Sequence, residues 1–231
     1  YLTGLCLERE EEKAGEASRV YYGLVKRFPD SPFSLKALER LRALTELGRE
    51  DLFYTGRLLY YQRKYEDAVR DLESYVEAHP EGTYAKHAHY FLGKAFYNLG
   101  EYQEALDQFG TVAKRYRKDP ISLKAHFNLA RCQERLGQDE LAVSSYERLA
   151  DLFPKSYLTD DALYGVGRYY ETRGDLEEAL AAYKRVVQEV PRQADYWDDA
   201  LLRTGLIYMA MRQPDSAATH LKQLLTGKTS L

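Results

Sequence analysis

The side chains best suited to acid–base, nucleophilic or metal chemistry are few and scattered along this chain. Cys6 and Cys132 have neither the spacing of a zinc site nor the number needed for a disulfide framework. His87 and His89 are two residues apart, so they point to different sides of a helix. A glycine-rich phosphate loop, the spacing of a catalytic triad and a paired-carboxylate cleft cannot be identified. The sequence therefore favours neither an enzyme nor a protein that holds a cofactor or metal.

A more regular pattern joins cations to aromatic rings. Four cations follow one another at equal steps, and we call them the basic series: Arg57, Lys94, Arg131 and Arg168. An aromatic residue stands four places before each, and we call these the aromatic series: Phe53, Tyr90, Phe127 and Tyr164. Residues four apart are neighbours on one helix face, so each pair presents a ring beside a cation. Cations make charge-assisted hydrogen bonds to carboxylates, and rings supply buried area, which is the chemistry of recognition.

Composition sets limits on the classes of protein. With 231 residues, 45% of them apolar and 30% charged, the chain can bury a large core and carry a polar surface. Its formal charge of −3 argues against a general binder of nucleic acid or anionic membranes, which usually have a basic excess. No apolar run approaches the length of a membrane span. Tyrosine is unusually abundant, with 21 copies.

The elements that must position the two series repeat along the chain. Small residues recur at Gly56, Gly93, Ala130, Gly167 and Gly205, with an alanine twelve places after each and a proline closing most units. Glycines at 100, 137 and 174 fall between the two halves of a unit, as a left-handed helix end requires. The apolar spacing on either side is helical and strand patterns are absent. Each unit is therefore predicted to be two helices joined by a tight turn, in an all-α fold.

This pattern resembles the tetratricopeptide repeat. Two units carry it best: Leu163, Val166, Gly167, Tyr170, Ala179, Tyr183, Val186 and Pro191 in one, and Leu92, Gly93, Phe96, Ala105, Phe109 and Val112 in the other. The resemblance covers residues 49–225 and implies a right-handed α-solenoid of stacked antiparallel helix hairpins. The usual period is about 34 residues. The longer period here, with Phe-Pro or His-Pro ending the second helix, is similar to bacterial envelope proteins of the Tol–Pal coordinator and outer-membrane-assembly lipoprotein types.

One solenoid over residues 1–231 is the expected domain organisation. Its repeats are predicted at 49–85, 86–122, 123–159, 160–197 and 198–231, after a partial first repeat at 1–30 and an additional helix within 31–48. The first helix of the partial repeat is expected to begin before Tyr1. For the stretch Phe33–Leu47, a separate helix and the first part of one kinked long helix are the two alternatives. No polar capping helix is apparent, so both ends are expected to be cut from a longer protein or covered by a partner.

The resemblance also places the two series. In this family, positions 5, 9 and 12 of each unit lie on the first helix and face the concave groove. Position 5 holds the aromatic series followed by Leu202, and position 9 holds the basic series followed by Leu206. Position 12 holds Tyr60, Tyr97, Glu134, Glu171 and Met209. The predicted partner-binding residues are Phe53, Arg57, Tyr60, Tyr90, Lys94, Tyr97, Phe127, Arg131, Tyr164 and Arg168.

A purely structural role is the competing interpretation of each residue. The aromatic series then packs between neighbouring first helices, and the cations pair with acids three places on, as in Arg131 with Glu134 and Arg168 with Glu171. His89 and His126 share position 4, normally a large apolar core residue, so we expect buried histidines there. Cys132 is expected to be a buried small residue.

These observations favour a non-catalytic scaffold whose concave groove binds a peptide or partner protein that carries acidic groups. A bacterial envelope complex, in the periplasm, is the expected setting. The alternatives are a substrate-docking or regulatory module of a larger enzyme and, with less support, a single-stranded RNA-binding repeat. No nucleic-acid partner is expected, and self-association through uncapped ends is compatible with each interpretation.

Overall fold

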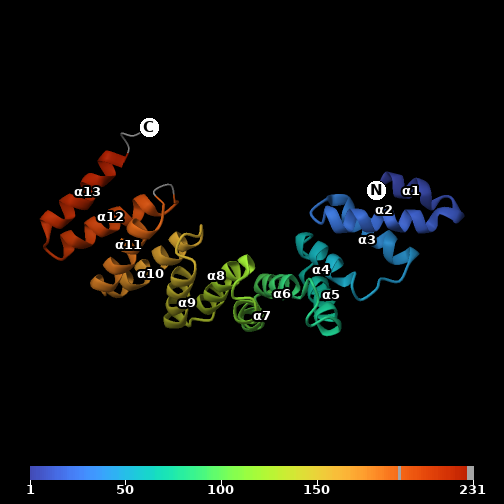
Figure 1. Cartoon of the computed structure of the whole chain (residues 1–231), viewed down its shortest axis with the longest axis horizontal. Coiled ribbons are helices and arrows are strands. Elements are labelled where there is room, and N and C mark those ends of the chain that lie inside the picture. Colours follow the sequence, from blue (N-terminus) through green and yellow to red (C-terminus); the bar gives the residue numbers. More distant parts are fainter. Residues whose placement is uncertain (192–193, 228–231) are drawn as a thin grey trace. The chain divides into compact units, whose positions relative to one another are not determined.

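The computed structural model describes residues 1–191 and 194–227, and in this part of the chain the regular elements are thirteen α-helices and one short 3-10 helix (Figure 1). The helices are α1 (Leu2–Glu8), η1 (Glu11–Lys13), α2 (Ala14–Arg27), α3 (Pro32–Leu44), α4 (Leu52–Tyr61), α5 (Tyr65–Ala78), α6 (Ala85–Leu99), α7 (Tyr102–Arg115), α8 (Pro120–Arg135), α9 (Asp139–Leu152), α10 (Thr159–Arg173), α11 (Leu176–Glu189), α12 (Trp197–Ala210) and α13 (Pro214–Gly227). No helix among the described residues has the length and apolar character to span a membrane. The fold is an all-α solenoid, as predicted.

The helices divide into two compact units, Tyr1–Ile121 and Ser122–Leu231. In the first unit α1 packs on α2, α4 on α5 and α6 on α7, while α5 also packs on α6. In the second unit α10 packs on α11, α12 on α13, and α11 on α12. Each unit is therefore a stack of helix hairpins, as the repeating pattern predicts. The limits of the single repeats and of one continuous domain stay predictions.

Close approach within each hairpin explains the recurring small residues. A Cβ atom on Gly56 would lie 2.6 Å from Leu72, and one on Gly93 would lie 2.8 Å from the Phe109 ring. Gly205 meets Leu221 in the same way. In these three hairpins a large side chain of the second helix thus fills the space above a glycine of the first. The twelve-residue offset to a buried alanine, such as Ala68 or Ala105, belongs to the same contact.

The turns between paired helices adopt the left-handed conformation that the glycine spacing predicts. Gly100, Gly137 and Gly174 have φ angles of 85°, 69° and 83°. The corresponding places in the α4–α5 and α12–α13 hairpins hold Arg63 and Arg212, with φ angles of 59° and 58°. The backbone is therefore the same in these hairpins, although only three of them place glycine at the turn.

The N-terminal hairpin pairs α1 with α2. α1 turns Gly4 toward the Tyr21 ring, and the expectation that this helix begins before Tyr1 stays a prediction. The Tyr21 hydroxyl donates to Glu8 at 2.8 Å. From Gly4 to Tyr21 the interval is one residue longer than from Gly93 to Phe109, and this insertion hides the pattern in the sequence.

The additional helix is separate from α4. α3 starts after Ser31, whose hydroxyl accepts from the Phe33 amide, and it ends at Leu44, three residues before the expected limit. Arg42 of α3 reaches Asp71 of α5 at 2.7 Å, and Thr55 of α4 donates to the same carboxylate at 2.5 Å. Burial raises the pKa of Asp71, although Thr55 and Arg42 both lower it. One buried carboxylate therefore ties α3 to the α4–α5 hairpin.

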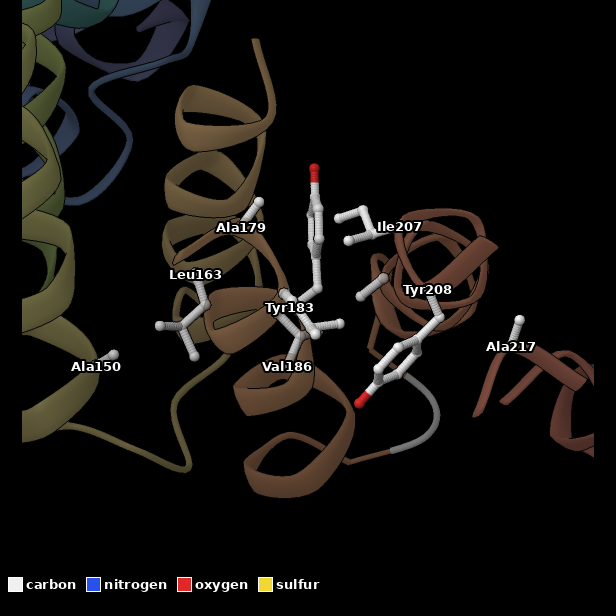
Figure 2. Close-up of a cluster of buried hydrophobic side chains, with 10 residues drawn as sticks. Ala150, Leu163, Ala179, Tyr183, Val186, Ile207, Tyr208 and Ala217 are labelled. Carbon is white, nitrogen blue, oxygen red and sulfur yellow. The ribbon is translucent and has the colours of Figure 1, made fainter. Parts of the chain in front are cut away.

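The core of the second unit runs between consecutive hairpins. Figure 2 shows the Tyr183 ring among Ala179, Val186 and Ile207, which come from α11 and α12. A neighbouring cluster joins Tyr146 of α9 to residues of α8 and α10. α9 and α11 are thus each covered on both sides, by their own first helix and by the next hairpin, so buried apolar area accumulates along the stack.

Candidate binding surface

The predicted site residues lie on the first helices of successive hairpins. α4 and α6 carry those of the first unit, and α8 and α10 carry those of the second. On each of these helices the small residue faces the second helix of its own hairpin. The cation of the basic series comes directly after the small residue, so it lies on a different face of the helix. The structure places the basic series as two pairs, one in each unit, and we describe each pair within its own unit.

The aromatic series supports the packing of neighbouring hairpins. Phe53 is only 2% exposed and stacks on Tyr84, the residue that precedes α6, with ring centroids 4.6 Å apart and planes 4° apart. Tyr164 stacks on Tyr196, just before α12, with centroids at 4.5 Å and planes at 18°. Phe127 is half-buried against Tyr146. Phe53 therefore lies beneath the surface, whereas Tyr90, Phe127 and Tyr164 are half-buried.

The two cations of the first unit are already engaged with the protein. Arg57 donates to the main-chain carbonyl of Lys26 at 2.6 Å, and its guanidinium carbon lies 5.7 Å from the centroid of the Phe53 ring. The Lys94 ammonium lies 4.8 Å from the Tyr60 centroid and 5.8 Å from the Tyr90 centroid. Burial lowers the pKa of Lys94, but the hydrogen bond with Tyr60 and the electrostatic interactions with Tyr60, Tyr90 and Tyr61 together outweigh it, and the net pKa is raised. Lys94 therefore keeps its charge while half-buried between two rings.

The cations of the second unit differ from each other in exposure. Arg131 is half-buried and its charge acts on Glu134 of the same helix. Arg168 is exposed, and no ion pair or hydrogen bond of its side chain is found in residues 1–191 and 194–227. Its expected partner three residues on, Glu171, pairs with Arg203 of α12 at 3.0 Å. The predicted Arg168–Glu171 pair is therefore wrong, because the carboxylate turns toward the next hairpin.

Position 12 follows a rule that the sequence reading missed. In hairpins whose second helix places a tyrosine over the small residue, position 12 is glutamate. Its carboxylate accepts a hydrogen bond from the tyrosine hydroxyl, as Glu171 does from Tyr183 at 2.8 Å. Glu8 with Tyr21 repeats this contact, and Tyr146 also hydrogen-bonds Glu134. Where the second helix places Leu72, Phe109 or Leu221, position 12 is instead Tyr60, Tyr97 or Met209. This pairing of residue types was the signal available in the sequence, and it gives these glutamates a structural role.

α12, the first helix of the C-terminal hairpin, presents an apolar face where the other first helices present a basic residue. Leu202, Leu206 and Met209 of α12, which we call the α12 stripe, are 40%, 47% and 58% exposed. They occupy the positions where the other first helices carry the aromatic series, the basic series and position 12. The departure of Leu206 from the basic series is thus part of a continuous exposed stripe.

His89, His126 and Cys132 are buried, as expected. His89 is 9% exposed, with Nδ1 2.7 Å from Gln108 Oε1, and His126 is 6% exposed. Burial raises the pKa of the Cys132 thiol to about 12, so it is not a reactive thiolate. No group of three His, Cys, Asp or Glu side chains within the described part of the chain is arranged to hold a metal ion.

The family model of the tetratricopeptide repeat matches residues 55–120, 92–157 and 155–194, and a second tetratricopeptide repeat model matches residues 199–226. Together these matches cover more than half of the chain. The chain belongs to the tetratricopeptide repeat family. Comparison with curated proteins found no match.

Solved structures of tetratricopeptide repeat proteins share this fold. A protein from Pseudomonas aeruginosa, pilF, is 13% identical with a TM-score of 0.59, and the match covers 94% of this chain and 95% of that one. MamA from Desulfovibrio magneticus RS-1 is 21% identical with a TM-score of 0.54, covering 80% and 98%. YrrB, described as a protein with an unusual peptide-binding site, is 20% identical with a TM-score of 0.53, covering 87% and 94%. At these identities the likeness concerns the fold.

Tetratricopeptide repeat proteins are in general non-catalytic scaffolds for protein–protein interaction, and this chain has the fold of such a scaffold. Its first helices offer charged, aromatic and apolar side chains on accessible faces, while its second helices contribute mainly to the core.

Proposed function

We propose that this protein is a non-catalytic scaffold that holds a peptide or partner protein against its first helices, with acidic groups of the partner contacting the basic series. The observation that supports this most is the state of Arg168. It is exposed, and the one acid expected to neutralise it is occupied by Tyr183 and Arg203. A carboxylate of a partner would form a charge-assisted hydrogen bond with this guanidinium.

The first unit contributes a second contact of the same kind. Lys94 is held over two rings and remains charged, so its position is fixed before a partner arrives. A cation fixed in this way loses little conformational entropy on binding, and its long-range field increases the rate of association with an acidic partner. Arg57 has less to offer, because part of its guanidinium is bound to Lys26.

The experiment is affinity capture from a lysate of the source cells, with the chain as bait and the captured protein identified by mass spectrometry. The test variant is the double change Lys94→Ala and Arg168→Ala, which removes one cation from each unit. The matched control is Lys114→Ala with Arg148→Ala, which removes equal charge from exposed positions on the second helices α7 and α9.

We expect a partner that the control retains and the test variant loses, and whose affinity for the wild type falls as salt is added. Equal capture by both variants would move the interface away from the first helices and contradict the proposal. Recovery of RNA in place of protein would contradict it too. Circular dichroism of both variants checks that the helices are intact.

We also propose the bacterial envelope as the setting, within a complex of the Tol–Pal coordinator or outer-membrane-assembly type. Its support is the long repeat period with Phe-Pro or His-Pro after the second helix, as at Phe153–Pro154 and His79–Pro80. Fractionation of source cells that carry a tagged copy tests this. Recovery with the cytoplasmic fraction would refute it.

A further inference from the structure

The α12 stripe is a surface whose residue types call for a particular partner. Its members are spaced four and three residues apart, so they form one line along the helix, about 10 Å long. All three keep two-fifths or more of their surface in water. A line of exposed apolar side chains flanked by charged residues is the type of surface at which proteins bind partners.

The charges beside the stripe indicate the polarity of the partner. The ion pair between Glu171 and Arg203 joins α10 to α12, and it lies three residues from Arg168 and one residue from Leu202. Arg203 contacts both Tyr164 and Glu171 of α10, which are one turn before and one turn after Arg168, so Arg168 is an exposed cation on the side of α10 that meets α12. At the other end Asp198 is exposed, one turn before Leu202. The surface is therefore apolar along its centre, positive at one side and negative at one end.

We infer that this face of the second unit binds an amphipathic helix of a partner protein, whose apolar side chains cover the α12 stripe and whose carboxylate pairs with Arg168. A helix presents apolar residues at the same three- and four-residue spacing, so two such lines can pack against each other along their length. An acidic residue on the flank of the partner helix forms an ion pair with Arg168, and a basic residue one or two turns away along that helix forms an ion pair with Asp198. This inference rests on the proposed function and names the chemistry of the partner.

The test is a selection from a phage-displayed library of random peptides, each about 16 residues long so that a helix can exceed the stripe. The immobilised target is the whole chain. The selected peptides are synthesised with a fluorescent label, and their Kd is measured by anisotropy. The variants are Leu206→Ser, Arg168→Ala, Lys94→Ala and, as a matched control, Leu141→Ser, which changes a leucine that is 55% exposed on α9.

We expect the selected peptides to share apolar residues at helical spacing and an acidic flank, and to gain helical circular dichroism on binding. Leu206→Ser should raise their Kd about tenfold or more, since a buried leucine contact is lost. Arg168→Ala should raise it about two- to fivefold, and more at low salt. Leu141→Ser should leave it unchanged.

Other outcomes overturn the inference in distinguishable ways. Peptides insensitive to Leu206→Ser but lost with Lys94→Ala would leave the proposed function standing and refute the helix site. Peptides that depend on Leu206 but bind in an extended form, or without an acidic residue, would refute the stated partner. A dimer in light scattering that Leu206→Ser dissociates would assign the stripe to a second copy of the chain. An empty selection would refute the inference alone, because capture of a folded partner tests the proposed function separately.

Discussion

A Cβ atom on Gly167 would lie 2.5 Å from Cε1 of Tyr183, closer than two carbon atoms can approach. The tyrosine is fully buried and stands on the second helix of the same hairpin. The glycine therefore sets the distance between α10 and α11, and the aromatic ring fills the space that it leaves.

Gly167→Ala should destabilise the protein by about 1–3 kcal/mol, because the added methyl forces the ring or the helix to move. Gly165→Ala is the matched control. It lies on the same helix, and a Cβ atom there would meet nothing within 4 Å. It should stabilise the protein by about 0.5–1 kcal/mol, since alanine favours the helix.

Urea unfolding of the two variants, followed by the fluorescence of the single tryptophan, measures both effects in the second unit. Trp197 is buried there and donates to the Val187 carbonyl at 3.0 Å. Equal free energies of unfolding for the two variants would show that the close approach has no energetic consequence.

The hydroxyl of Tyr183 leads to a prediction about alkaline pH. Burial raises the pKa of Tyr183, and its hydrogen bond to Glu171 raises it further. The same two causes raise the pKa of Tyr21 to about 12. In the unfolded chain these groups ionise near pH 10. Between that pH and the folded pKa the unfolded state binds fewer protons, so stability falls as pH rises.

Tyr183→Phe should cost about 1 kcal/mol at pH 7, through loss of the hydrogen bond to a carboxylate. It should also reduce the loss of stability between pH 7 and 11, because one titrating group is removed. Tyr157→Phe, which changes a tyrosine that is 65% exposed, is the control. The free energy of unfolding at the two pH values is measured for each variant, and identical pH dependence in both would contradict the assignment.

The sequence predicts the hairpins from backbone requirements, whereas side-chain contacts between helices leave only weaker signals, such as the pairing of glutamate at position 12 with tyrosine on the second helix. The spacing of Gly93, Ala105 and Gly100 indicates two helices and a left-handed turn, because each of these needs a small residue or a positive φ angle. No such backbone requirement marks Glu171. Its partners, Tyr183 and Arg203, lie on two other helices. The three side-chain torsions of Glu171 decide whether its carboxylate reaches these two residues or Arg168, which is nearer in the sequence.

The candidate surface was predictable to a similar extent. Helical periodicity puts each cation of the basic series on one helix face with its aromatic neighbour, and the role of these residues in binding stays a prediction. It does not predict that Tyr84 lies flat on Phe53, because Tyr84 belongs to a loop whose path the period leaves open. The stacking depends on tertiary contacts, and it decides which rings remain accessible.

Arg63 offers a test of the turn geometry. Its φ angle of 59° is unfavourable for any residue with a Cβ atom, and the corresponding residue of the next hairpin is Gly100. Arg63→Gly should therefore stabilise the protein by about 0.5–1 kcal/mol. Gly100→Ala should destabilise it by about 1 kcal/mol. Thermal unfolding followed by circular dichroism measures both changes, and a loss of stability in Arg63→Gly would show that the arginine side chain stabilises the turn.

Phe53 separates the two roles of the aromatic series. Its burial predicts that Phe53→Ala costs about 3–5 kcal/mol of stability, as for other buried aromatic residues. Tyr61 lies on the same helix and is 48% exposed, so Tyr61→Ala should reduce the free energy of unfolding much less. Chemical denaturation of both variants gives the comparison.

The binding role of the same ring is tested with a milder change. Phe53→Leu keeps an apolar side chain in the core, so the fold should persist at a cost of about 1 kcal/mol. If Phe53 only supports the surface, the Kd for a captured partner should stay within about twofold of the wild type, whereas Lys94→Ala should weaken it. A folded Phe53→Leu variant that binds as weakly as Lys94→Ala would mean that α4 opens on binding and that the buried ring contacts the partner.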